Sequence, residues 1–300
     1  MDYDIIIIGA GPAGICAAIY ALRANQKTLI IEKETIGGKI ASSPLIENYP
    51  GIKAIKGPEL SEQLEEQIKQ LGGKIEFGEV MDIQNKGKEK IVITKNKTHK
   101  AKAIILALGT KYKTLGLPEE EKFLGKGISF CATCDGFFYR QKTVAVIGGG
   151  NSAMANSIEL ANICQKVYVI QKLDHLTAEP MLIDQIRQKE NIEIMTQASV
   201  KEIQGEEKLT GIVIEEKGKE KRLTLEGMFL SIGQIPETEI VSHLVKRDEN
   251  GYIVTNEQKM TNSEGIFAAG DCVKKNIRQL TTAVSDGTIA ALSAIEYNTK

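Results

Sequence analysis

The sequence of 300 residues carries almost no net charge, with 38 basic residues against 39 acidic ones. Global electrostatics therefore gives no reason to expect nucleic acid or an anionic membrane as a partner. Long apolar runs are also scarce, because the longest begins at Ile5 and is soon interrupted by Gly9 and Gly11. Asp2 and Asp4 stand where a signal peptide would carry basic residues. We expect neither an export signal nor a membrane span.

Cysteine and histidine are few, at five and three residues. An odd number of cysteines argues against a secreted disulfide framework, so the expected location is the cytoplasm. A zinc site usually needs a second close pair of ligands, whereas the residues outside the one close pair are scattered, and no metal is expected. Cys16 and Cys164 are interpreted as small core residues. The scattered residues are Cys16, Cys164, Cys272, His99, His175 and His243.

A glycine-rich motif opens the chain, in a sequence whose length suggests about two domains. Residues 4–14 read DIIIIGAGPAG, an apolar strand followed by a G-x-G-x-x-G turn and an apolar helix. Gly9 makes the tight turn, Gly11 lets the backbone approach a pyrophosphate, and Gly14 allows close packing of helix on strand. The next strand, TLIIE, ends in Glu32, whose carboxylate can bind a ribose.

The same plan recurs at TVAVIGGGNSA, residues 143–153. The strand that follows, KVYVIQK, places Gln171 as far from Gly148 as Glu32 lies from Gly9. Similar runs of short β-type segments come after both loops, and a helix is expected at 58–71. We predict an internal duplication in an α/β fold, with two Rossmann-like three-layer dinucleotide-binding domains.

Between the loops, residues 129–136 read SFCATCDG, with Cys131 and Cys134 two residues apart and Asp135 directly behind them. In a reducing compartment such a pair indicates a redox or a metal element. A zinc half-site and inert core packing are the alternatives. The position next to a nucleotide-type loop favours the redox interpretation.

Together with GIFAAGDC (265–272) and RQLTTAVSDG (278–287), these motifs resemble the low-molecular-weight thioredoxin reductases over nearly the whole chain. The resemblance implies a discontinuous FAD-binding domain, 1–115 and 248–300, with a NAD(P)-binding-like domain inserted at 116–247 that carries the cysteine pair. Residues 114–118 and 245–251 would be the two linkers. By itself, GIFAAGDC is equally typical of a buried strand and turn with a helix-capping Asp.

The resemblance also implies the cofactor site. The first loop would hold the FAD pyrophosphate, Gly38 and Asn48 would lie beside the isoalloxazine, and Asp271 would bond the ribityl chain. Lys39 stands where many relatives carry a glutamine, which leaves that flavin contact open. The full expected set is Gly9, Gly11, Pro12, Ala13, Gly14, Glu32, Lys33, Gly38, Lys39, Asn48, Val80, Gly109, Asp271, Arg278, Gln279 and Leu280.

In such a reductase the flavin passes two electrons to the cysteine pair, which exchanges with the disulfide of a partner. Asp135 would donate and accept the proton, and Cys134 is expected on the flavin side. One domain would rotate against the other to present the pair to each side in turn. Phe137 and Phe138 match family positions that help to form the docking surface for thioredoxin or a thioredoxin-like protein, although buried core packing is the alternative.

The electron donor is where the sequence departs from the family. Ala155 and Asn156 replace two glutamates, and the cationic H-R-R-x-x-x-R segment becomes residues 171–177, QKLDHLT. Guanidinium groups bind a 2′-phosphate far better than Lys172 can, and Gln171 lacks the acid that favours NADH. NADPH bound poorly, NADH and reduced ferredoxin all remain open as donors. The nicotinamide-nucleotide set would be Gly148, Gly150, Asn151, Ser152, Ala153 and Lys172, unless the loop persists only as a turn.

Three hypotheses follow. The first is a FAD-dependent thioredoxin-disulfide reductase, homodimeric as the family implies, and the second is a ferredoxin-dependent form of it. The third is a redox-sensing flavoprotein that catalyses nothing. A ferredoxin-NADP reductase of related fold is disfavoured because such enzymes do not need the CATC pair.

Overall fold

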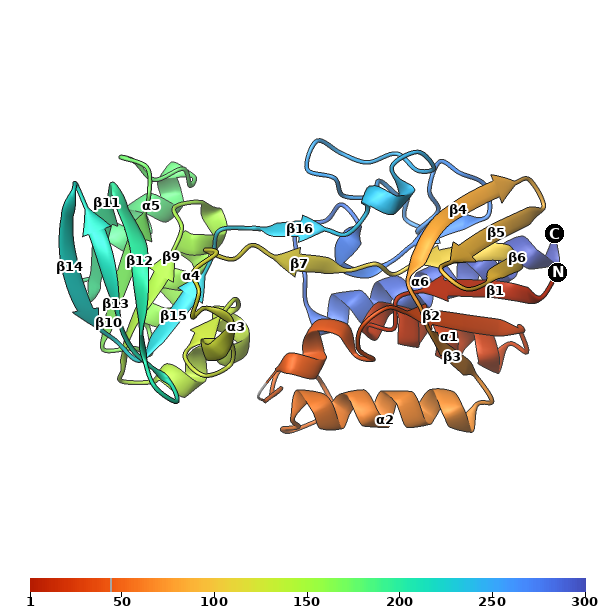
Figure 1. The fold of residues 1–300 in the computed structure, drawn as a ribbon, viewed down its shortest axis with the longest axis horizontal. Helices are drawn as coiled ribbons and strands as arrows, with labels where there is room; N and C mark the ends of the chain where they lie inside the picture. The colour runs from red at the N-terminus through yellow and green to blue at the C-terminus, as the bar shows by residue number, and fades with distance from the viewer. Residues whose placement is uncertain (44) are drawn as a thin grey trace. The chain divides into compact units, whose positions relative to one another are not determined.

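The computed structural model describes residues 1–43 and 45–300 and divides them into two compact units. Unit 1 comprises 1–111 and 235–300, and unit 2 comprises 112–234, so unit 2 lies in sequence between the two segments of unit 1. The chain passes between the units at β7 (Thr110–Tyr112) and β16 (Gln234–Pro236), which pair with each other (Figure 1). No helix in 1–43 and 45–300 has the length and apolar character to span a bilayer.

The division differs from the expected boundaries at 115 and 247. Residues 115–117 belong to unit 2, where their three N–H groups donate to the buried carboxylate of Glu120. Residues 235–247 belong to unit 1, because Val241 and Val245 are buried in its core. The segments expected as linkers, 114–118 and 245–251, are therefore parts of the two units, and the crossings lie at β7 and β16.

Unit 1 is built on a mixed sheet in the order β3-β2-β1-β6-β5-β4, with β17 paired to β6. The apolar run at β1 is buried on both faces: Ile5 and Ile7 pack in one core cluster and Ile6 and Ile8 in another. The strands are β1 Tyr3–Ile8, β2 Thr28–Glu32, β3 Lys74–Phe77, β4 Val80–Lys86, β5 Glu89–Thr94, β6 Thr98–Leu106 and β17 Ile266–Ala268.

One face of this sheet is covered by α1 (Pro12–Arg23) and α6 (Leu280–Thr299), which pack against each other (Figure 1). Fully buried alanines on both helices allow this close approach: Ala17, Ala18 and Ala21 on α1, and Ala290, Ala291 and Ala294 on α6. The helix expected at 58–71 is α2, Gly57–Gln70. Among the residues of unit 1 that the structure describes are the short 3-10 helices η1 Gly38–Ser42, η4 Glu239–Val241 and η5 Gly270–Cys272.

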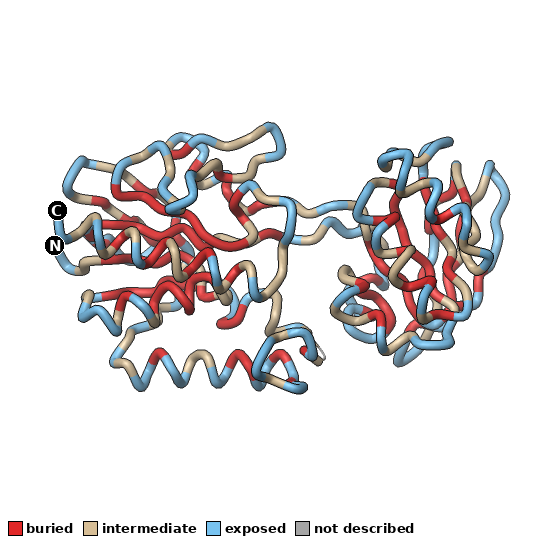
Figure 2. The backbone as a smooth tube through the Cα atoms, turned by 180° about the vertical axis from the view of Figure 1, so that it is seen from behind, coloured by how far each residue is buried: buried red, intermediate tan, exposed pale blue. Residues whose placement is uncertain are grey.

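Unit 2 has a parallel sheet in the order β11-β10-β9-β15-β8 and an antiparallel sheet β12-β13-β14. Val144 and Val146 of β9 face the helices, whereas Ala145 and Ile147 face the antiparallel sheet, which gives three layers. Buried residues run along the central strands of both units (Figure 2). The elements are β8 Ile128–Ser129, β9 Thr143–Ile147, β10 Lys166–Gln171, β11 Ile192–Thr196, β12 Ala198–Gly205, β13 Leu209–Glu216, β14 Lys219–Thr224, β15 Gly227–Leu230, α3 Ala132–Asp135, α4 Asn151–Ala161, α5 Pro180–Arg187, η2 Glu121–Phe123 and η3 Gly136–Tyr139.

Candidate active site

The first glycine loop joins β1 to α1, and its three glycines have different reasons to be glycine. A Cβ on Gly9, whose φ is +104°, would lie 2.3 Å from the carbonyl oxygen of Ala107, and one on Gly14 would lie 1.9 Å from that of Gly9. A Cβ on Gly11 would meet no atom of the described residues within 4 Å. Packing thus requires Gly9 and Gly14, while Gly11, next to Pro12 and Ala13 at the start of α1, leaves room for a ligand.

Glu32, at the end of β2, holds this loop in place through hydrogen bonds to backbone N–H groups. One carboxylate oxygen accepts the N–H of Ala10 at 2.6 Å and the other accepts that of Glu34 at 2.8 Å. The side chain is buried, which strengthens both bonds. Because each carboxylate oxygen has a second lone pair, Glu32 can still accept a bond from a ribose hydroxyl.

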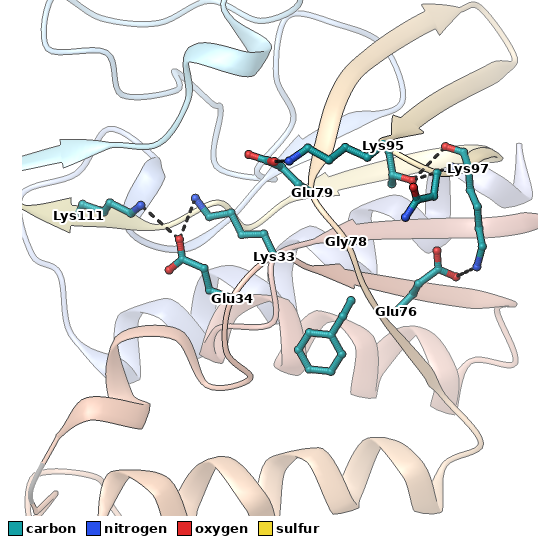
Figure 3. Close-up of a pocket in the computed structure, with 11 residues that line it drawn as sticks. Lys33, Glu34, Glu76, Gly78, Glu79, Lys95, Lys97 and Lys111 are labelled. Atoms are coloured by element: carbon teal, nitrogen blue, oxygen red, sulfur yellow. Dashed lines mark hydrogen bonds and ion pairs between the residues drawn. The ribbon is translucent and has the colours of Figure 1, made fainter.

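A pocket of about 530 Å³ opens beside this end of β2 (Figure 3). It is lined by the residues after β2, by the end of β3 and the residues after it, by the turn between β5 and β6, and by Lys111 of β7. Lys33, one of the predicted cofactor residues, is among them. Its rim is charged and paired, with Lys95 at 2.6 Å from Glu79 and Lys97 at 3.0 Å from Glu76. The volume suits one end of a large cofactor.

On the other side of the loop, Lys39 donates to Asp271 at 2.5 Å and to Thr110 at 2.9 Å. Asp271 follows Gly270, where a Cβ would lie 2.8 Å from that of Ala13 on α1. Lys39 follows Gly38, where a Cβ would lie 3.4 Å from Gly11. The structure therefore brings these predicted residues together around the first loop.

The contacts of Asp271 extend into a chain of alternating charges that sequence reasoning missed. Lys275 lies 3.9 Å from Asp271 and 2.9 Å from Asp286, which also pairs with Lys259 at 2.7 Å. All these side chains are largely buried. These charged residues lie on separate segments of the chain, so their spacing in the sequence does not predict the network. It becomes apparent only in the folded structure.

The remaining predicted cofactor residues of unit 1 lie on several elements. Arg278 donates to the carbonyl oxygen of Asp271 at 3.2 Å, and Gln279 caps α6 just before Leu280. Val80 begins β4 and is buried, and Gly109 has a φ of +69°. Asn48 is exposed, in the loop between Ile46 and Ile55.

The cysteine pair of unit 2 forms a disulfide with a Cα–Cα distance of 5.3 Å. Cys131 precedes α3, and its sulfur accepts the N–H of Cys134 at 3.2 Å. Burial raises the pKa of Asp135, whose Oδ2 accepts the Ser129 hydroxyl at 2.6 Å. Ser129 was not expected in the site, although it begins the SFCATCDG segment.

The other cysteines are unsuited to redox chemistry. Cys16, Cys164 and Cys272 are buried, and burial raises the pKa of Cys164 and Cys272 to about 11. Because the thiolate is the reactive form, these thiols are inert near neutral pH. Cys16 and Cys164 are core residues, as predicted. No metal-binding cluster is found in the part of the chain that the structure describes.

The two phenylalanines after the pair differ. Phe137 is 63% exposed, whereas Phe138 is partly buried. Core packing therefore does not account for Phe137. An exposed aromatic ring three residues after a disulfide-bonded cysteine is suited to a protein contact.

The second glycine loop joins β9 to α4 and keeps the turn of the first. Gly148 has a φ of +132°, and a Cβ on it would lie 2.5 Å from the carbonyl oxygen of Ser231. The side chain of Gln171 covers Gly149, where a Cβ would lie 2.3 Å from Nε2. Its amide donates to the carbonyl oxygen of His175 at 3.2 Å and accepts the N–H of Lys172 at 3.0 Å.

The other predicted nicotinamide residues lie at the start of α4. Asn151 exchanges two hydrogen bonds with Glu179, and Gly150, Ser152 and Ala153 complete the turn. Lys172 is exposed, and beyond it Asp174 contacts His175 at 2.5 Å. That bond lowers the pKa of Asp174, which therefore keeps a negative charge two residues after Lys172.

Residues 3–287 match the pyridine nucleotide-disulphide oxidoreductase family. The chain belongs to that family. A thioredoxin reductase of Bacillus subtilis (strain 168) is 40% identical over 298 residues, which cover 98% of this chain and 94% of the relative. The crystal structure of thioredoxin reductase from Streptococcus pyogenes MGAS5005 is similar with a TM-score of 0.93 and 39% identity, over 98% of this chain and 97% of that one.

A ferredoxin-flavin thioredoxin reductase from Clostridium acetobutylicum is also similar, with a TM-score of 0.55 and 30% identity over 100% of this chain and 98% of that one. The resemblance to the thioredoxin reductases is thus confirmed. With the disulfide in place in unit 2, the family member described here is a FAD-dependent disulfide oxidoreductase.

Proposed function

We propose that this enzyme reduces the disulfide of thioredoxin or a thioredoxin-like protein, with electrons passing from FAD to the Cys131–Cys134 disulfide and then to the partner. The observation that carries the proposal is the disulfide itself, formed next to a buried acid and an exposed phenylalanine. The thioredoxin reductases among its relatives support the choice of partner.

The residues of unit 1 fit FAD. Gly11 leaves the start of α1 open, where backbone N–H groups favour a pyrophosphate. Glu32 retains acceptor capacity for the adenosine ribose, and the pocket beyond Lys33 offers room for the adenosine end. Asp271, held by Lys39 and Arg278, would bind the ribityl chain. FAD, when bound, supplies two electrons that can reduce a disulfide.

The chain's own residues then perform the exchange. The Cys134 N–H that points to the Cys131 sulfur stabilises charge on that sulfur, which makes Cys131 the nucleophile toward the partner. Asp135 holds the proton that the sulfurs need. Phe137, with Phe138 beside it, would bind the partner's apolar surface.

The donor is proposed to be a reduced nicotinamide nucleotide without preference for NADPH. The loop from Gly148 to Ala153 keeps its turn, but the charge of Asp174 opposes a 2′-phosphate. A second candidate is reduced ferredoxin. It is favoured by the engaged amide of Gln171, which offers little to a ribose, and by the likeness to a ferredoxin-flavin thioredoxin reductase.

The proposal includes a cytoplasmic location and a homodimer, and it assigns no role to nucleic acid or membrane. The isolated, buried thiols suit a reducing compartment. Light scattering of the purified protein measures the oligomeric state.

The test is anaerobic titration of the flavin absorbance with NADH, NADPH and reduced ferredoxin, followed by turnover with thioredoxin. Cys131→Ser and Cys134→Ser should abolish disulfide reduction while FAD remains bound. Cys164→Ser is the matched control and should retain turnover. Failure of the wild-type protein to reduce any thioredoxin with all three donors would refute the proposal and leave the redox-sensing alternative.

A further inference from the structure

The hydroxyl of Ser129 lies between the cysteine pair and its acid. Its oxygen accepts the N–H of Cys131 at 3.2 Å, and its O–H donates to Asp135 Oδ2 at 2.6 Å. A hydroxyl has one hydrogen to donate, so the Cys131 carbonyl oxygen at 3.5 Å is the weaker competitor. Ser129 is itself buried on β8, which pairs with β15 through Phe229. The parallel sheet thus fixes this hydroxyl.

The second oxygen of the acid is unsatisfied. Asp135 Oδ1 is buried and has no hydrogen-bond partner among residues 1–43 and 45–300. A buried polar atom without a partner destabilises the folded state, because it has lost its bonds to water. Cys134, the residue before Asp135, is held in a disulfide that has no hydrogen to donate, whereas a reduced pair would have one. The free oxygen therefore indicates a group that finds its partner only after the disulfide is reduced.

We propose that Ser129 is a positioning residue of disulfide reduction, which holds Asp135 Oδ2 so that Oδ1 delivers a proton to the Cys134 sulfur. The inference rests on the proposed function, which supplies the electron pair from the reduced flavin. That pair breaks the S–S bond and leaves two negative charges on sulfur. One proton from Asp135 converts Cys134 into a thiol, and Cys131 stays a thiolate, stabilised by the Cys134 N–H.

The proton returns in the second half of the cycle. The Cys131 thiolate attacks the partner's disulfide, forming a mixed disulfide and releasing one partner thiolate. Cys134 then gives its proton back to Asp135 and attacks the Cys131 sulfur, which restores the enzyme's disulfide and releases the second partner thiolate. Throughout, the Ser129 hydroxyl stabilises whichever carboxylate charge develops.

Tyr139 and Cys164, the titratable groups of the neighbouring elements with raised pKa values, stay protonated near neutral pH. Tyr139 of η3 has its pKa raised to about 12 by burial and by the charge of Asp135. Cys164 donates to the Tyr139 carbonyl oxygen, and burial raises its pKa to about 11. Glu159 of α4 is bonded to Thr133 on α3 at 2.8 Å. A pH dependence of the internal electron transfer is therefore assigned to Asp135 and the two thiols.

The test compares Ser129→Ala, Ser129→Thr, Asp135→Asn and the double variant of Ser129→Ala with Asp135→Asn. The readout is the rate at which photoreduced flavin is reoxidised by the enzyme's own disulfide, measured against pH. Ser129→Ala should lower this rate about tenfold. It should also move the limb of the pH–rate profile that reflects Asp135 to higher pH. The reason is that the Ser129 hydroxyl opposes the rise in the pKa of Asp135 that burial causes. Ser129→Thr keeps the hydroxyl and should restore both.

Two controls separate positioning from folding. Ser157→Ala removes another buried hydroxyl of unit 2, bonded to the Ala153 carbonyl oxygen at 2.7 Å, and should leave the pH limb in place. In the Asp135→Asn background, Ser129→Ala should add less than twofold, since both act through one carboxyl group.

A pH limb unchanged in Ser129→Ala, or rate losses that multiply in the double variant, would overturn the inference. These measurements need no thioredoxin. A wild-type enzyme that transfers electrons internally but not to thioredoxin would therefore refute the proposed partner without deciding the role of Ser129.

Discussion

The two glycine-rich loops share a backbone plan but differ in the residue that lies behind the turn. In unit 1 that residue is Glu32, whose carboxylate accepts the N–H of Ala10. In unit 2 it is Gln171, whose amide instead bonds to its own strand end at Lys172 and His175. The glycines therefore indicate only that the turn forms. The residue behind them determines which ligand the loop can bind. A glycine pattern alone does not establish that a loop still binds a nucleotide.

The third glycine position makes the same point. A Cβ at Gly14 would lie 1.9 Å from a backbone oxygen, yet its counterpart in unit 2 is Ala153, which carries a Cβ. The first loop is thus closed more tightly onto its helix than the second. The variants below use these paired positions, in order of decreasing expected effect.

The largest effect is expected for Gly14→Ala. The clash is with the backbone of Gly9, which no side-chain rotation relieves, so unit 1 should lose about 3 kcal/mol of stability. FAD should be lost on purification. Thermal unfolding and the flavin-to-protein absorbance ratio measure both effects. Ala153→Gly, the reverse change in unit 2, should cost no more than about 1 kcal/mol; equal losses from the two variants would contradict the comparison.

Glu32→Gln should follow. The amide can accept the N–H of Ala10 but then turns its own N–H₂ toward that of Glu34, so a charge-assisted bond worth about 1.5–3 kcal/mol is lost. FAD affinity should fall about tenfold or more, as measured by fluorescence titration of the apoprotein. Glu62→Gln, on the exposed face of α2, is the control. Unchanged FAD affinity would show that the carboxylate only shapes the loop.

Gln171→Glu makes the second loop resemble the first. The new carboxylate fits the same space over Gly149 and can accept bonds from a ribose 2′-hydroxyl. NADH should bind about tenfold more tightly, as expected for one charge-assisted bond, and NADPH should gain nothing. Isothermal titration measures both. An equal gain for the two nucleotides would mean that residue 171 does not face the ribose.

Lys172→Ala should have the smallest effect. A single exposed lysine contributes little to phosphate binding, and the charge of Asp174 two residues on opposes it. The dissociation constant for NADPH should change by less than about twofold. A large loss of NADPH binding, with NADH unaffected, would show that a phosphate site survives in unit 2.

Much of this arrangement is predictable from sequence because the signals are local. Both glycine loops, the strands before them and the helix α2 follow from spacing and periodicity, and the reactive cysteines stand only two residues apart. The contacts that set the boundaries of the two units, by contrast, join residues that are far apart in the sequence or carry no local signal. No local sequence pattern indicates that Glu120 accepts hydrogen bonds from residues 115–117. Likewise, no local pattern indicates that Val245 packs against a sheet formed by the first third of the chain.

The site shows the same limit. Lys39 lies shortly after the first glycine loop in sequence, but its partner Asp271 comes from the far end of the chain. The sequence does not predict a role for Ser129, because a serine two residues before a cysteine can have many roles. Its importance appears only when its distances to Asp135 and Cys131 are known.

The split architecture of unit 1 also orders events during synthesis. Its strand β17 and helix α6 come last, and Asn298 donates to the carbonyl oxygen of Asp4 at 3.1 Å. The first 111 residues must leave the ribosome before β17 and α6 can complete their sheet and its helical layer, while the complete unit 2 can fold behind them. Unit 2, which carries Cys131 and Cys134, can therefore fold during synthesis before the FAD-binding unit is complete.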